Sequence, residues 1–361
     1  MTPTTLDHPQ ATLYYWFHQS PRRLSTMRTA GALSFHQKSL TVPSPYLSLD
    51  DRLAYLRSHG YVHGNDEISA RSRSFLADVN FHYYLGYARN YRTLVRKGLA
   101  EFHGAADRII DIIELDHQLA EHTYTAVRIF EWRLRAHFVI EHCRHHPPTE
   151  CFLSPGHFTS RSTGGKPTSA RVREEILRSR EPYILEQFAA HARTCGAPWQ
   201  GSPSLLDKAQ QSEVLKSLPI WAVVDSWSLG LLTDVIMETR PGKQQPETPP
   251  WKSVAQAFGI SNQVLDTQLR SLIVLRNMIA HHSRLWMRPA TRAPKKPKIY
   301  RRRARNVQDR SLYTVLLALA SFLRSDSRDT VFLDKVDRLL ESNKIFAQGI
   351  RSPLTTSEPP R

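Results

Sequence analysis

The stretch of sequence that decides the fold is residues 106–142, ADRIIDIIELDHQLAEHTYTAVRIFEWRLRAHFVIEH. It contains no proline, and its apolar residues recur at helical spacing. This spacing places them on one face of an α-helix, where they can be buried together. The members of this stripe are Ile109, Ile112, Ile113, Leu119, Val127, Phe130, Leu134 and Phe138. The pattern predicts two long helices divided within residues 114–117, or one helix that runs through.

The rest of the chain is also typical of helices. LSLDDRLAYLRSHGY offers Ser48 as an N-cap, then apolar Leu53 and Leu56, then a stop at Gly60, which together predict a short helix. Helical spacing continues through residues 169–193, 218–238, 253–282, 312–324 and 330–340. No segment alternates with period two for long enough to build a sheet. We therefore predict an all-α protein.

The predicted organisation is one helical domain with irregular ends. Residues 1–38 show no sustained periodicity and are expected to form a flexible N-terminal extension. Residues 39–345 form the helical domain, and residues 346–361, rich in Pro and Ser, are expected to be a disordered tail. Residues 147–169, PPTECFLSPGHFTSRSTGGKPTS, have the composition of a long exposed loop.

Composition limits the class of protein. The chain has 361 residues, 40% of them hydrophobic, so it can bury a sizeable core. Its net charge of +16 favours a polyanionic partner, with nucleic acid first and an acidic membrane surface second. The longest apolar run, residues 313–323, is about half of what a membrane span needs, so it predicts a buried helix. Three cysteines without CxxC spacing argue against a disulfide scaffold or a zinc ribbon, and with no secretory signal they indicate a cytoplasmic protein.

The segment LRNMIAHHSRLW, residues 275–286, places polar residues in a helical context. On a helix, Asn277 and His281 share a face, and a long Arg276 side chain can reach the same spot. This set suits metal-independent cleavage of RNA: histidine can transfer the proton, arginine can stabilise the phosphate charge, and Asn277 could orient the imidazole. His282 points elsewhere and is at most a supporting residue. The alternative is a polar patch that only stabilises a helix.

Two other polar clusters lie on the long helical stretch. Glu114 and Asp116, beside His117, are ordinary solvated charges unless their helix packs against the motif, in which case an acid could orient His281 or pair with Arg276. His142 and His146 are one helical turn apart and look like half of a zinc site. No second pair of ligands is evident, so neither a metal nor another cofactor is predicted, and the histidines are assigned to a helix C-terminus that favours cations.

A basic segment, residues 292–305, follows the motif. Its cations could contact a phosphate backbone while Tyr300 and Trp286 stack on bases, which predicts RNA binding. The alternative is a solvated, flexible charge run. The candidate RNA-binding residues are Arg292, Lys295, Lys296, Lys298, Arg301, Arg302, Arg303 and Arg305.

With these residues considered, the chain resembles the abortive infection proteins of bacterial phage resistance, the AbiD and AbiF type, whose helical core belongs to the HEPN superfamily. The likeness spans residues 38–341 and includes LSLDDRLAYLRSHGY, NFHYYLGYARNYR, IIELDHQLAEHTYTAVRIFEWRLRAHF, LPIWAVVDSWSLGLLTDVI, VAQAFGI and LRNMIAHHSRLWMRP, in that order. It ends at the SLYTVLLALASFL segment, and the family's glycine and tryptophan ending is absent. The resemblance implies a HEPN-like helical bundle with additional helices.

The resemblance also implies an activity and partners. Several HEPN proteins are endoribonucleases whose R-x-x-x-x-H signature falls here on Arg276 and His281, followed by a polar residue at Asn277. Their active site forms where two such motifs meet, and no second motif lies at a matching helix, which implies a homodimer. The protein would be an RNase toxin, restrained by a small structured RNA. The alternative is a defence protein that binds RNA or a partner without cutting.

Overall fold

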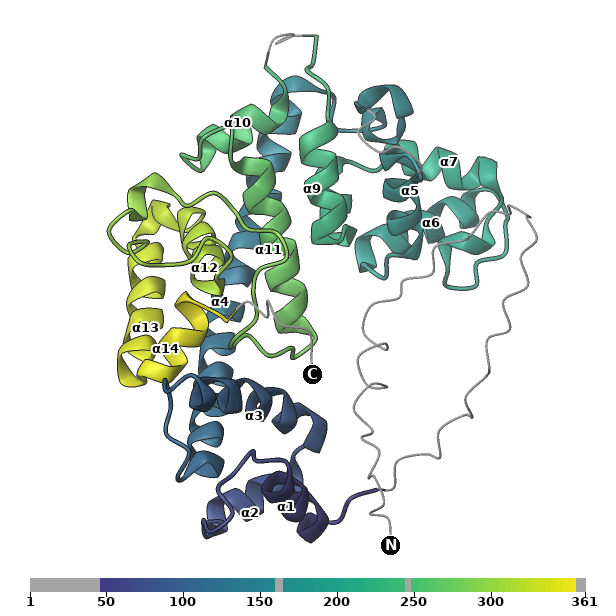
Figure 1. Ribbon diagram of the computed structural model, residues 1–361. Helices are drawn as coiled ribbons and strands as arrows, with labels where there is room; N and C mark the ends of the chain where they lie inside the picture. The colour runs from purple at the N-terminus through teal and green to yellow at the C-terminus, as the bar shows by residue number, and fades with distance from the viewer. Residues whose placement is uncertain (1–45, 160–164, 244–247, 355–361) are drawn as a thin grey trace, which may run out of the picture. The chain divides into compact units, whose positions relative to one another are not determined.

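The computed structural model describes residues 46–159, 165–243 and 248–354. All of the described helices lie in one compact unit, Leu47–Arg361. The described residues form fourteen α-helices and six short 3-10 helices, with no strand among them, so the all-α prediction is confirmed (Figure 1). The predicted flexible extension, residues 1–38, lies outside the described residues.

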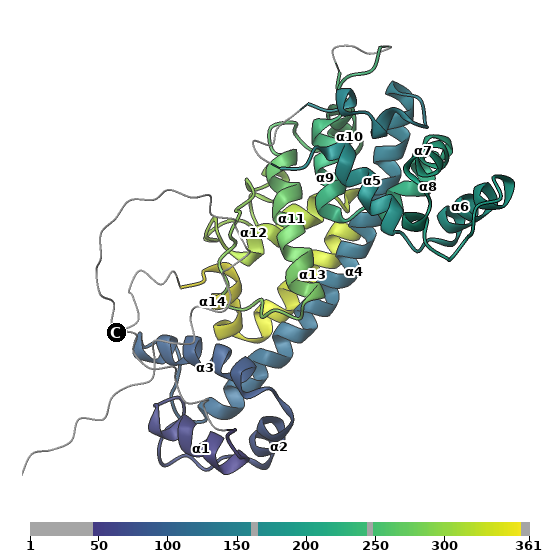
Figure 2. The ribbon, with the colours of Figure 1, turned by 90° about the vertical axis from the view of Figure 1, so that its right-hand side faces the viewer.

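The central element is α4 (Ala105–His145), one uninterrupted helix of 41 residues. It begins after Gly104, which has a left-handed backbone with φ of 67°, and ends at His146, just before two prolines. All eight residues of the predicted apolar stripe are buried. Helix α4 runs from α2 and α3 at one end to α10 at the other, and α11, α12 and α13 pack along it (Figure 2). The rest of the fold is therefore organised around one rod.

Three helices precede α4. The prediction for the first is confirmed: Ser48 and Asp51 form a capping box, Leu53 and Leu56 are buried, and Gly60 turns the chain with φ of 61°. Their bounds are α1 (Leu49–Ser58), α2 (Ala70–Asp78) and α3 (Phe81–Arg96).

The segment after α4 differs from the exposed loop that its composition predicts. Two 3-10 turns, η1 (Cys151–Leu153) and η2 (Pro155–His157), fold it against the end of α4, and Phe152 and Phe158 are buried. The prediction was wrong for residues 147–158 because aromatic side chains can bury a proline-rich segment that lacks helical periodicity. The elements that follow are α5 (Thr168–Arg178), α6 (Pro182–Thr194), η3 (Pro203–Leu205), α7 (Lys208–Ser217), α8 (Ile220–Val223), η4 (Val224–Ser226), α9 (Leu229–Glu238) and α10 (Pro250–Ala257).

The C-terminal helices complete the unit. They are α11 (Leu265–Ala280), η5 (Lys298–Tyr300), α12 (Leu312–Ser321), η6 (Arg324–Asp326), α13 (Arg328–Ser342) and α14 (Lys344–Arg351). Every residue of α12 is buried, as predicted for the longest apolar run. No described helix combines the length and the apolar character that crossing a membrane requires.

Helix α14 corrects the expectation of a disordered tail from residue 346. Asn343 caps the helix, and Phe346 and Ile350, one turn apart, are fully buried. The Pro- and Ser-rich composition of the end of the chain concealed this short apolar face, which is too brief to show a clear period. The last seven residues, 355–361, lie outside the described residues.

Candidate active site at the end of helix α11

The predicted motif lies at a helix end rather than inside a helix. Helix α11 stops at Ala280, His281 is its C-cap, and His282 has a left-handed backbone with φ of 50°. Both imidazoles are exposed. The backbone N–H of His281 still donates to the Asn277 carbonyl over 3.0 Å, so the backbone of His281 stays hydrogen-bonded to the last turn of α11. The C-cap position gives the imidazole an open approach that a side chain within a packed helix would lack.

Asn277 contacts the arginine rather than the histidine. Arg276 Nη1 donates to Asn277 Oδ1 over 3.4 Å, and the described residues include no side-chain bond between Asn277 and His281. The amide is exposed. Asn277 is therefore placed to orient the guanidinium.

Arg276 is held by an acid that the sequence analysis did not identify. Its Nε donates to Glu131 Oε1 on α4 over 3.1 Å, while Glu131 Oε2 lies 3.3 Å from Arg135 Nη1. The Glu131 side chain is 15% exposed and that of Arg276 is 42% exposed. One edge of the guanidinium is thus fixed by a mostly buried carboxylate, and the remaining edge is available to an anion.

A pocket of about 570 Å³ adjoins this ion pair. Arg276 and Ala280 of α11 line it together with the cations Arg128 and Arg135 of α4, and Ala280 directly precedes His281. The rings of Tyr124 and Trp132, also in the lining, are 51% and 68% exposed. The full lining is Tyr124, Val127, Arg128, Glu131, Trp132, Arg135, Asp225, Arg276, Ile279 and Ala280. Arginines beside exposed aromatic rings are a combination that binds phosphates and stacks on bases.

The two acids predicted to support this site lie elsewhere. Glu114 is paired with Arg71 of α2, with 2.8 Å between Glu114 Oε2 and Arg71 Nη2. Asp116 is 2% exposed and accepts hydrogen bonds from the backbone N–H groups of Leu285 and Trp286, each over 2.9 Å. Neither acid contacts Arg276 or His281, because both lie on turns of α4 well before Glu131. The recorded partners of Glu114 therefore lie away from the motif, whereas Asp116 reaches the motif through the turn that follows it.

Asp116 instead fixes the chain that follows the motif. It also accepts from Tyr87 over 2.6 Å, Tyr87 bonds to Tyr83 over 3.0 Å, and Tyr83 bonds to His117 Nε2 over 2.9 Å. We call Tyr83, Tyr87, Asp116 and His117 the tyrosine–aspartate network. Burial raises the pKa of Asp116 to about 6, and the hydrogen bonds from Tyr87 and the two N–H groups oppose this rise. Burial lowers the pKa of His117, and the charge of the neighbouring His282 lowers it further.

The tyrosine–aspartate network also gives a structural reason for the sequence YYLGY in α3, residues 83–87. Arg284 Nη1 donates to the Gly86 carbonyl, and its guanidinium lies 5.5 Å from the centre of the Tyr87 ring. A Cβ at Gly86 would lie 2.7 Å from Arg284 Nη1, so a larger residue there would force the guanidinium to shift. The segment thus has a structural role: it holds the turn that presents His281 and His282.

The C-terminal helix, α14, also contacts the turn that follows the motif, through Trp286. Trp286 is fully buried, and its Nε1 donates to the Ile345 carbonyl over 3.3 Å. A Cβ at Gly349 of α14 would overlap the indole, with Cε2 only 2.7 Å away. Because Trp286 is enclosed here, it cannot stack on a base, and that part of the RNA-binding prediction was wrong.

The basic segment, residues 292–305, is partly used within the protein. Lys296 pairs with Asp309 over 2.8 Å, and Arg303 is held by Asp334 and Asp337 of α13. Tyr300 is half-buried and donates to Asp329 over 2.6 Å. The other six predicted cations are exposed and form no ion pair with the described residues: Arg292, Lys295, Lys298, Arg301, Arg302 and Arg305. Four of these, Lys298, Arg301, Arg302 and Arg305, line a second pocket of about 680 Å³ that shares no residue with the first.

Two clusters of the described residues could hold a metal ion. In one, Asp66 bonds to His103 and to the Gly104 N–H, so its carboxylate already supports the start of α4. In the other, His142 lies beside Cys151 and His157. The sequence analysis singled out His142 but missed both partners, because they follow in a segment that composition assigns to an exposed loop.

A family model described as Abi-like protein matches residues 74–287, more than half of the chain. The matched part includes the tyrosine–aspartate network, Glu131, Arg276 and His281, and it ends at the residue after Trp286. The basic segment and helices α12 to α14 lie beyond it. No curated protein and no solved structure matches the chain.

Proposed function

Because the chain belongs to the Abi-like family of bacterial abortive infection proteins, which act in defence against phage, we propose that it is a HEPN-type endoribonuclease toxin acting in the cytoplasm through Arg276 and His281. The observation that carries the proposal is the position of Arg276. A mostly buried carboxylate orients it at a pocket rich in arginine and exposed aromatic rings, whose lining reaches Ala280, the residue before the exposed His281. These groups suit cleavage of RNA without participation of a metal ion.

In the proposed reaction the 2'-oxygen of a ribose attacks the adjacent phosphorus, and the bond from phosphorus to the 5'-oxygen breaks. One imidazole accepts the proton of the 2'-hydroxyl, and a second imidazole, protonated at the start, donates a proton to the departing 5'-oxygen. Arg276 stabilises the charge on the phosphate oxygens in the transition state. The products are a 2',3'-cyclic phosphate and a 5'-hydroxyl. Asn277 acts as a positioning residue for Arg276 through its Oδ1.

This chemistry needs two imidazoles, which supports a homodimer. The sequence contains one R-x-x-x-x-H, at residues 276–281. A second copy of the chain would supply the second His281, and the exposed rings of Tyr124 and Trp132 beside the pocket provide apolar area for such an approach. Light scattering should give twice the chain mass, and specific activity should fall on dilution below the dimer dissociation constant. A monomer with full activity at all concentrations contradicts this part of the proposal.

Cleavage of total RNA by the full-length protein tests the assignment. Arg276→Ala and His281→Ala should each reduce the rate by about 100-fold or more, the usual contribution of such groups. His82→Ala, which removes another exposed imidazole, is the matched control and should cut normally. The new 5' ends should accept label from a polynucleotide kinase without prior phosphatase treatment. Equal cutting and equal growth arrest by wild type and both variants would show that Arg276 and His281 are not catalytic.

A second function, RNA binding without cleavage, is favoured by the basic segment. Its six exposed cations could hold a phosphate backbone, including that of a small structured RNA that restrains the toxin. In that case replacing Lys298, Arg301 and Arg302 by Ala would weaken binding, and no product with a 5'-hydroxyl would form at any concentration of the wild-type protein.

A further inference from the structure

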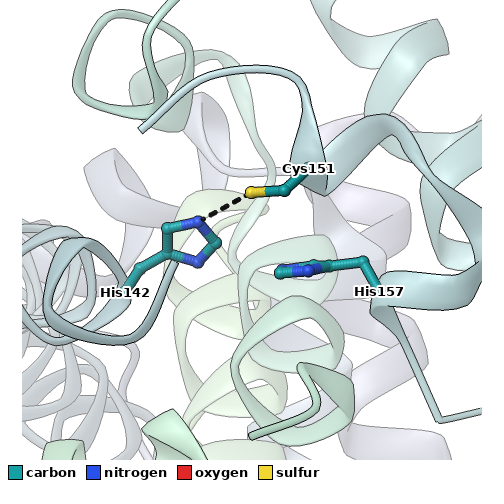
Figure 3. Close-up of side chains that lie close together, drawn as sticks. All are labelled: His142, Cys151 and His157. Atoms are coloured by element: carbon teal, nitrogen blue, oxygen red, sulfur yellow. Dashed lines mark hydrogen bonds between the residues drawn. The ribbon is translucent and has the colours of Figure 1, made fainter. Parts of the chain in front are cut away.

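Three side chains converge where α4 ends and the next segment folds back. His142 lies on the last turns of α4, Cys151 begins η1, and His157 ends η2 (Figure 3). One ring nitrogen of each histidine and the Cys151 Sγ all lie within 4.8 Å of one another. The sulfur is 3.4 Å from His142 Nε2. In a tetrahedral zinc site, ligand atoms are separated by about 3.3–3.6 Å, given Zn–N of roughly 2.0 Å and Zn–S of roughly 2.3 Å. The separation between the sulfur and His142 Nε2 matches this value, and the other ligand atoms lie at most about 1.5 Å beyond it.

The burial of polar atoms also indicates a missing partner. His142 and His157 are buried, and within the described residues His142 Nδ1 and His157 Nε2 have no hydrogen-bond partner. Buried polar groups without partners are rare in folded proteins, and an ion bound beside the sulfur and His142 Nε2 would supply the partner that His157 Nε2 lacks.

We propose that His142, Cys151 and His157 bind a structural transition-metal ion, Zn²⁺, that fastens residues 147–158 to the end of α4. The thiolate and imidazole donors are those that Zn²⁺ prefers, whereas Ca²⁺ and Mg²⁺ require oxygen ligands. This role is independent of the proposed RNA cleavage.

His146 is the candidate for the fourth ligand. It follows His142 with the H-x3-H spacing found in structural zinc sites. The centre of its ring lies 4.4 Å from that of His157. Its Nε2 donates to the Arg240 carbonyl over 2.8 Å, which leaves Nδ1 as the nitrogen with a lone pair. Metal-binding histidines commonly donate their other N–H to a backbone carbonyl in this way.

The ion would join two parts of the helical unit. His157 and Phe158 accept hydrogen bonds from Arg240, just after α9, over 2.9 and 3.1 Å. Fixing His157 to His142 therefore links the end of α9 to the end of α4. A disulfide cannot make this link, because none of the three cysteines, Cys143, Cys151 and Cys195, lies on α9.

Metal content of the full-length protein tests the proposal. Protein purified without chelator should contain about one equivalent of zinc per chain by mass spectrometry. After replacement by Co²⁺ it should show a thiolate-to-cobalt charge-transfer band in the near ultraviolet. Cys151→Ser should abolish that band and weaken zinc binding by at least about 100-fold, since loss of a ligand should exceed the 10- to 100-fold effect of outer-shell changes. Zinc should raise the melting temperature of wild type but not of Cys151→Ser.

Cys195→Ser is the matched control, because Cys195 Sγ also lies beside an imidazole, 3.5 Å from His191 Nε2, but at an exposed site. It should retain zinc and the cobalt band. His157→Ala should behave as Cys151→Ser does; if it fails to fold, the nearly isosteric Cys151→Ser decides alone. Less than about a tenth of an equivalent of zinc in wild type, with no thiolate band on adding Co²⁺, would overturn the proposal. So would a band that survives Cys151→Ser.

Discussion

Asp116 provides the sharpest prediction, because one buried carboxylate satisfies three donors from two distant parts of the chain. Asp116→Ala leaves two backbone N–H groups, at Leu285 and Trp286, and the Tyr87 hydroxyl without their acceptor. At about 2 kcal/mol for each buried donor, the loss is about 6 kcal/mol. Removing the buried charge returns about 3 kcal/mol, the cost that corresponds to a pKa of about 6 against an ordinary value of 3.8. The free energy of unfolding should therefore fall by about 3 kcal/mol at pH 7.5.

Urea denaturation followed by tryptophan fluorescence measures this change. Glu114→Ala is the matched control, since it removes a carboxylate two residues earlier on α4 whose partner Arg71 is exposed, and it should cost less than about 1 kcal/mol. RNA cleavage by Asp116→Ala should also fall, because the turn that follows His281 loses its anchor. A change in stability within 1 kcal/mol of the control would refute the reasoning, because the three hydrogen bonds would then contribute no more than the buried charge costs.

Three further predictions follow from the same region and from the basic segment. Wild type should lose about 2 kcal/mol of stability relative to Asp116→Asn as the pH rises from 4 to 6.5, measured by urea denaturation across that range. Burial raises the folded-state pKa to about 6, so the folded state binds the proton more tightly than the unfolded state and is favoured at low pH. Gly349→Ala should lower the free energy of unfolding by about 2 kcal/mol through overlap with Trp286, whereas Gly230→Ala, where a Cβ meets no atom within 4 Å, should not destabilise. Replacing Lys298, Arg301 and Arg302 together by Ala should reduce the slope of log affinity for single-stranded RNA against log salt by about 2, at roughly 0.7 for each phosphate contact. Arg303→Ala should leave that slope unchanged, because Arg303 is paired with acids of α13. Equal slopes for wild type and the triple variant would exclude the basic segment from phosphate binding.

Features set by neighbouring residues could be predicted from the sequence. The capping box of α1 needs only Ser48 and Asp51, three positions apart, and the buried stripe of α4 needs only its own spacing. The sequence could not decide whether α4 breaks near Glu114, because a short polar stretch is compatible with a continuous helix and with a break between two helices. Asp116 lies within that stretch but is buried by α3 and by the turn after α11.

The parts that sequence analysis missed depend on contacts between distant residues. Glu131 looks like any charged residue on α4 until α11 brings Arg276 to it. Cys151 and His157 join His142 only because η1 and η2 reverse the chain, and no local period marks that reversal. Helix α14 was missed because its signal is two apolar residues, and its packing depends on Gly349 meeting Trp286.

The ion pair between Glu131 and Arg276 can form only late during synthesis of the chain. The two residues are 145 positions apart, so at a rate of about 5–20 residues per second Glu131 emerges from the ribosome roughly 7–30 s before its partner. During that interval Val127, Phe130 and Leu134 of α4 have no α11, α12 or α13 to cover them. The nascent chain is thus incapable of forming the Arg276 pocket until most of its length has been translated, and until then the apolar stripe of α4 lacks the helices that bury it.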